Sequence, residues 1–186
     1  MLSELLKEHT LTNHQQLEKM LVQRMKAIRS TDGYIDLLQL FYTYFGGLEQ
    51  EIDRYITATE LPDYQQRRKS AALANDITAL GGTPQAKAFG TTLPTIQNTM
   101  QAYGALYVIE GSTLGGKIIS KMMAQQLEIK DGAGLSFFNS YGDNTELMWD
   151  TFKQTLNNRV KSEGEAAEVI ESANQTFGKF KEWAAR

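Results

Sequence analysis

The chain of 186 residues contains no cysteine, three prolines and two histidines. The lack of cysteine excludes disulfides, thiolate metal ligands and a cysteine nucleophile. No run of about 18 apolar residues occurs, so the sequence predicts no transmembrane helix. The first ten residues, MLSELLKEHT, are charged and amphipathic, which is not the pattern of a signal peptide. We therefore expect no membrane association and a cytoplasmic location.

The charge of the chain argues against one class of partner. The formal net charge is −3 and no run of Lys and Arg forms a basic arm, so nothing here attracts nucleic acid. Hydrophobic residues make up 41% of the chain, which is ordinary for a globular protein that buries a core. The sequence predicts one domain over residues 1–186.

Apolar residues recur at helical spacing along most of the chain, and no segment alternates as a strand does. The prolines, Pro62, Pro84 and Pro94, lie where this periodicity breaks. The pattern predicts an all-α helical bundle. Its expected helices are Ser3–Ile28 with Ser3 as N-cap, Tyr34–Ala58, a third from Pro62 to Gly81-Gly82, a glycine-bearing helix over Tyr103–Met123 capped by Thr92 or Thr95, Thr145–Lys161 and Glu165–Ala184.

The helix predicted over Tyr103–Met123 carries four glycines, at positions 104, 111, 115 and 116. Four interior glycines cost a helix about 4 kcal/mol relative to alanine. Gly111 and Gly115 fall within about 20° of Gly104 around the helix, so one stripe lacks side chains. The pair Gly115-Gly116 favours a kink there. The bare stripe fits either close packing against another helix or a flat, wide ligand.

The two histidines are His9 and His14. His14 shares one helical stripe with Lys7 and has Glu18 one turn away, but two candidate ligands are too few for zinc or non-haem iron. A lone histidine at the apolar border of a helix is more often a hydrogen-bonded core or surface residue. One imidazole is nevertheless sufficient for haem (heme), whose porphyrin supplies the other ligands.

Other chemistries have no support in the sequence. No G-x-S-x-G motif occurs, and the glycines do not lie between a strand and a helix as in a phosphate-binding loop. Haem accounts for both unusual features, because a helix without side chains can lie against a planar macrocycle while His14 binds the iron from another helix. Lys7 could then meet a propionate.

Two motifs resemble the haem oxygenases, in particular the bacterial biliverdin-producing type. Leu2–Thr10, LSELLKEHT, followed by His14, is similar to the opening helix of the family. Residues 107–116, YVIEGSTLGG, are similar to the distal-helix motif. Weaker similarity continues through Phe137-Phe138, Trp149, Phe152-Lys153 and residues 174–177.

The resemblance implies a haem-oxygenase-like fold with a glycine-kinked distal helix, and it implies roles for individual residues. His14 would be the proximal iron ligand, and His9 would be structural or exposed. The implied catalytic wall on the distal side is Gly111, Ser112, Gly115 and Gly116. Further cofactor-binding candidates are Lys7 and Lys153 near the propionates, with Tyr107, Phe138, Tyr141 and Tyr103 as aromatic residues of either the pocket wall or the plain core.

The implied reaction is oxidative cleavage of haem to biliverdin, carbon monoxide and Fe(II). Haem is both substrate and cofactor, O2 is consumed, and a ferredoxin- or flavodoxin-type protein supplies electrons. The animal enzymes carry an aspartate where this chain has Ser112. That difference leaves a non-catalytic haem-binding protein for storage or transfer as the alternative, and a helical interaction module without haem as a third possibility.

Overall fold

The computed structural model describes residues 1 to 186 and confirms the all-α prediction, since it contains no β-strand. No helix is long and apolar enough to span a membrane. Three short 3-10 turns interrupt the loops, at Tyr64–Gln66, Gly90–Thr92 and Gly142–Asn144. The α-helices are α1 (Leu2–Ala27), α2 (Thr31–Ile52), α3 (Ala71–Ala79), α4 (Thr99–Gly111), α5 (Thr113–Gln126), α6 (Thr145–Arg159) and α7 (Glu163–Ala184).

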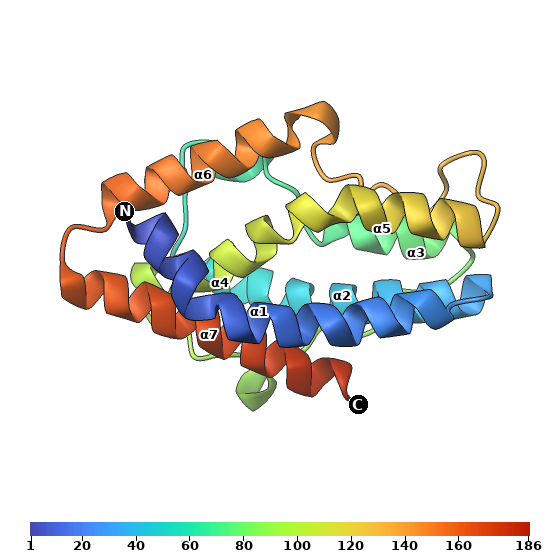
Figure 1. The fold of residues 1–186 in the computed structure, drawn as a ribbon, viewed down its shortest axis with the longest axis horizontal. Coiled ribbons are helices and arrows are strands. Elements are labelled where there is room, and N and C mark those ends of the chain that lie inside the picture. The colour runs from blue at the N-terminus through green and yellow to red at the C-terminus, as the bar shows by residue number, and fades with distance from the viewer.

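Helix α1 crosses the front of the molecule with α2 behind it, and α4 and α5 follow one another between α1 and α6 (Figure 1). Helix α7 packs along both α1 and α4. The core is rich in aromatic rings. Tyr44 stacks on Phe180 with ring centroids 4.6 Å apart, and Phe41 packs edge-to-face with Phe180 and with Phe138 at 5.3 Å between centroids. These contacts hold α2, α7 and the loop after α5 together.

The first two helices differ from prediction mainly at their ends. Helix α1 starts one residue before Ser3, so Ser3 is not its N-cap. The backbone N–H of Ser3 donates to Asn157 Oδ1 instead. Helix α2 stops at Ile52 and not at Ala58. The carboxylate of Glu60 accepts hydrogen bonds from the backbone N–H and hydroxyl of Thr57, which closes a turn in place of further helix.

The prediction that the third helix begins at Pro62 is wrong. Helix α3 begins only at Ala71, and the backbone of Arg67 is extended. The cause is long-range: Arg67 Nη1 forms an ion pair of 2.6 Å with Glu110 of α4, and both side chains are 1% exposed. Arg67 also donates two hydrogen bonds to Asp63. A buried arginine and carboxylate must be paired, and this pairing overrides helix propensity in the segment.

The long glycine-bearing helix is broken, but at Ser112 and not at Gly115-Gly116. Asn98, and neither Thr92 nor Thr95, caps its first half, because the Asn98 side chain accepts from the N–H of Gln101. At the break, the carbonyl of Ile109 accepts hydrogen bonds from Ser112 Oγ and from Arg68 Nη2. An inserted side chain at such a carbonyl is a recognised cause of a helix kink.

The first glycine of the stripe serves helix packing. A Cβ atom at Gly104 would lie 2.4 Å from the carbonyl oxygen of Val169 and 2.7 Å from Cβ of Ser172, both on α7. Only a glycine allows α4 and α7 to approach so closely. Of the two interpretations of the bare stripe, close helix contact is therefore correct at this position.

We predict that Gly104→Ala lowers the free energy of unfolding by about 1–3 kcal/mol, because the added methyl group overlaps the backbone of α7. Gly178→Ala is the matched control, since it lies on α7 with no atom within 4 Å of an added Cβ. The control should be neutral or stabilise by up to about 1 kcal/mol. Urea unfolding measures both, and equal stabilities would contradict the close α4–α7 contact.

Candidate haem site

A cavity of about 780 Å³ lies between α1 on one side and α4 and α5 on the other. Its size is within the range of cofactor pockets. Seventeen of its 28 lining residues are hydrophobic, and α2, α6, α7 and the loop after α5 supply the remaining walls. Such a lining suits a large, mostly apolar ligand with a few polar anchors.

His14 lines this cavity from α1. Its imidazole packs edge-on against Phe177, with ring centroids 5.8 Å apart, and is otherwise exposed to the cavity. No group of three or more His, Asp or Glu side chains is arranged to hold a metal ion. His14 is the one histidine in the lining of the cavity. His9 lies outside the lining and is exposed.

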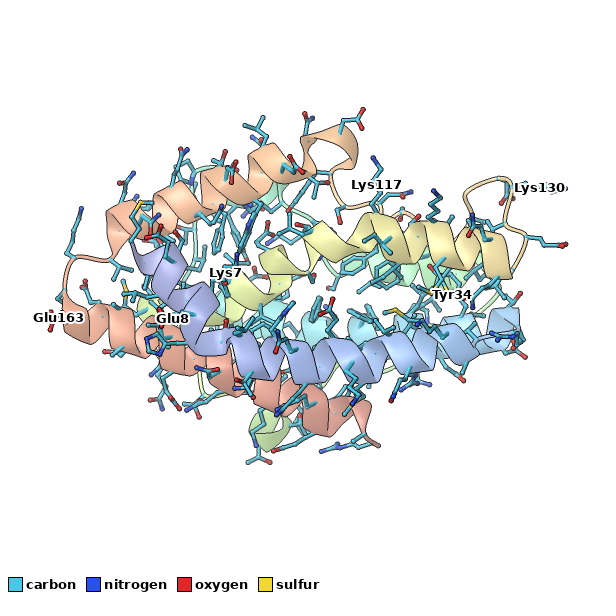
Figure 2. All side chains as sticks on the ribbon, viewed as in Figure 1. Lys7, Glu8, Tyr34, Lys117, Lys130 and Glu163 are labelled. Carbon is cyan, nitrogen blue, oxygen red and sulfur yellow. The ribbon has the colours of Figure 1, made fainter.

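Lysines mark one end of the cavity. Lys7 and Lys153 both line it, from α1 and α6 respectively. Figure 2 shows Lys7 on the side of α1 that faces α6. Lys153 also pairs with Asp150 at 2.9 Å, but that contact is largely exposed and contributes little. The opposite end is apolar, with Val22, Met25 and Met122. The ammonium groups of the lining thus lie at one end only, where the Glu4 carboxylate also lines the cavity.

The glycines of the distal motif divide into two groups. Gly111 and Gly115 line the cavity, and a Cβ at Gly115 would meet no atom within 4 Å. Gly116 does not line it. A Cβ there would lie 2.2 Å from the carbonyl oxygen of Phe138, so Gly116 lets the loop after α5 approach the helix. The predicted wall therefore consists of Gly111, Ser112 and Gly115, with Gly116 behind it.

The aromatic residues predicted for the pocket wall also fall into two groups. Tyr107 and Phe138 line the cavity, and Tyr107 contacts Trp149 at 5.4 Å between centroids. Burial raises the pKa of the Tyr107 hydroxyl, so this residue stays neutral near neutral pH. Tyr103 lies elsewhere, where its hydroxyl donates to the carbonyl of Glu60.

Tyr141 is outside the cavity as well, contrary to its predicted place in the pocket wall. Its hydroxyl donates to the Glu110 carboxylate at 3.0 Å and accepts from the backbone N–H of Arg68. Burial, together with the Glu110 charge, raises the pKa of Tyr141 and keeps it a neutral donor. Tyr141 joins the loop before α6 to the break in the distal helix.

The sequence did not reveal Arg68. This side chain is buried behind Ser112, and its Nη2 donates to Ser112 Oγ at 2.6 Å. Its guanidinium lies 3.7 Å from the centre of the Phe137 ring. Burial lowers the pKa of Arg68 to about 10, against the effect of Glu110, so it remains cationic at neutral pH. The available signal was the Arg67-Arg68 pair, which in a predicted helix would be expected to face solvent.

Comparisons with known proteins place these features in a family. The family model described as heme oxygenase matches residues 1–186. A relative named heme oxygenase, from Xanthomonas campestris pv. campestris (strain 8004), is 28% identical over 152 residues, which cover 80% of this chain and 87% of the relative.

Two solved structures share the fold. The NO- and CO-bound heme oxygenase from Neisseria meningitidis aligns with a TM-score of 0.84 at 24% identity, over 99% of this chain and 90% of the other. Heme oxygenase from Leptospira interrogans aligns with a TM-score of 0.77 at 18% identity, over 99% and 98%. Because the family model covers the whole chain, this protein belongs to the heme oxygenase family.

Proposed function

We propose that the cavity between α1 and the α4–α5 pair binds haem, with His14 as the proximal iron ligand, and that the protein cleaves this haem to biliverdin, carbon monoxide and Fe(II). One observation carries the proposal. A lone imidazole and a wall without side chains, at Gly111 and Gly115, line the same largely apolar cavity from different helices. Haem degradation is the activity that family membership supports, and nothing favours a non-catalytic haem-binding protein.

The residues of the cavity fit haem. The porphyrin would supply four nitrogen ligands, so the single imidazole of His14 completes what the iron requires from this side. Phe177 packs edge-to-face against the imidazole from α7. When bound, haem supplies the iron that activates O2 and is also the molecule that is oxidised.

The uneven charge of the cavity would fix how haem is rotated. Its two propionates lie on one edge of the ring, and Lys7 and Lys153 offer ammonium groups at one end of the cavity. Val22, Met25 and Met122 would receive the apolar edge at the other end. Placing the propionates among the apolar residues would bury charges without partners, which is costly. The orientation that places the propionates beside Lys7 and Lys153 is therefore favoured.

On the distal side, Gly111 and Gly115 would let the ring lie close to the helix backbone, and Ser112 would provide a hydroxyl beside it. Van der Waals contact with the ring excludes bulk water from this side. The reaction consumes electrons, and a separate donor protein would supply them. A ferredoxin- or flavodoxin-type donor and a cytoplasmic location stay predictions.

We expect the protein to bind hemin with a saturable one-to-one change in the Soret absorbance band. His14→Ala should alter the Soret position and the iron spin state, or abolish binding, because it removes the single protein ligand. His9→Ala is the matched control, since His9 lies on the same helix outside the cavity, and it should behave as the unchanged protein. A His14→Ala complex with an unaltered spectrum would rule out His14 as the ligand.

We also expect Gly115→Ala to separate binding from stability. No atom lies within 4 Å of the added methyl group, so the free energy of unfolding should change by less than about 1 kcal/mol. Hemin affinity should fall by roughly tenfold or more, because the methyl group enters the space of the ring. Gly178→Ala, equally free of neighbours, should leave the affinity unchanged. Unaltered hemin affinity in Gly115→Ala would contradict the proposed distal wall.

A further inference from the structure

The distal wall has no carboxylate. The acidic side chains that line the cavity, Glu4 and Glu18, both belong to α1, on the His14 side. At the break between α4 and α5, Ser112 is the polar side chain that lines the cavity. Its hydroxyl is also committed elsewhere, because Oγ donates to the carbonyl of Ile109 at 2.6 Å. A hydroxyl has only one proton to donate.

Arg68 contacts both atoms of this hydrogen bond. Its Nη2 donates to Ser112 Oγ at 2.6 Å and to the Ile109 carbonyl oxygen at 3.0 Å. Its Nη1 donates to the Phe137 carbonyl oxygen and to Ser140 Oγ, at 3.1 and 3.3 Å. The remaining donor, Nε, is buried and has no partner. Arg68 is absent from the cavity lining, and Ser112 is the lining residue to which its guanidinium donates a hydrogen bond.

This geometry has a consequence for the Ser112 proton. If the hydroxyl hydrogen rotates toward the cavity, the Ile109 carbonyl keeps its hydrogen bond from Arg68 and is not left unpaired. Ser112 Oγ keeps a charge-assisted bond from the same cation. That bond polarises the hydroxyl and strengthens it as a donor. Without Arg68, the rotation would leave a buried carbonyl without a partner.

We propose that Arg68 is a positioning residue that allows Ser112 to donate its hydrogen bond into the cavity, to a small hydrogen-bond acceptor on the distal face of haem. The Arg68–Ser112 pair thereby takes the place of a distal carboxylate. The inference rests on the proposed function, since it requires haem in the cavity. Arg68 does not itself reach the ligand.

A purely structural role for Arg68 would have different consequences on substitution. Arg68 ties the loop at Phe137–Ser140 to α4, so its loss would lower stability whether or not Ser112 is oriented. Arg67 is the matched control. It is adjacent and also buried, its partners are Glu110, Asp63 and the Met148 carbonyl, and it makes no hydrogen bond to Ser112.

The test is an absorbance titration of the ferric hemin complex with sodium fluoride, a small anion that only accepts hydrogen bonds. Ser112→Ala and Arg68→Met should each weaken fluoride binding by roughly 5- to 10-fold, which is the effect of one lost hydrogen bond. The double variant should be no weaker than either single variant, because both remove the same bond. Arg67→Met should stay within about twofold of the unchanged protein.

Three results would overturn the inference: unchanged fluoride affinity in Arg68→Met, additive losses in the double variant, or an equal loss in Arg67→Met. If Arg68→Met does not fold, Arg68→Lys decides in its place. A lysine keeps the charge but lacks the planar fork that reaches both oxygens, so we expect weakened fluoride binding there too. Hemin binding is measured first. Its absence in the unchanged protein would defeat the proposed function, whereas normal hemin binding with unaltered fluoride affinity would defeat only the role of Arg68.

Discussion

Two hydrogen bonds to the carbonyl of Ile109, from Ser112 and Arg68, mark the break between α4 and α5. In a continuous helix, this carbonyl would pair with the N–H of Thr113. The break turns the chain so that Gly111, Ser112 and Gly115 all line one cavity. The cation behind the break is held in turn by the Phe137 and Ser140 acceptors and lies over the Phe137 ring. The shape of the distal wall therefore depends on one buried arginine.

The glycines of α4 and α5 have two different structural roles. Gly104 and Gly116 lack side chains because neighbouring backbone fills that space, from Val169 and Phe138 respectively. Gly111 and Gly115 line the cavity, where a Cβ atom would make only an ordinary contact with Trp149 at Gly111 and none within 4 Å at Gly115. The first pair sets the spacing of the scaffold, and the second pair leaves one wall of the cavity without side chains. Spacing along the helix could not separate Gly104 from Gly111 and Gly115, because all three share one stripe.

Local patterns in the sequence predicted the helical class, most helix positions and the residues on the two sides of the cavity. Apolar periodicity and glycine content can be read directly from the sequence, because they concern residues within a few helical turns of one another. The conformation of the segment before α3 could not be predicted in this way, since the partners of Arg67 and Arg68 are Glu110, Ser112 and Phe137. These residues are distant in the chain, and no local pattern indicates that they meet. Tyr141 and Gly116 were misplaced for the same reason, because their contacts are long-range.

The central claim is that this cavity both binds haem and supports its cleavage. The most direct measurement is to add ascorbate in air to the one-to-one hemin complex and to follow the absorbance spectrum with time. We expect the Soret band to decay while biliverdin absorption rises in the red, and carbon monoxide to be released. A Soret band that persists under reduction, with no biliverdin formed, would contradict the account and would identify a haem-binding protein without oxygenase activity.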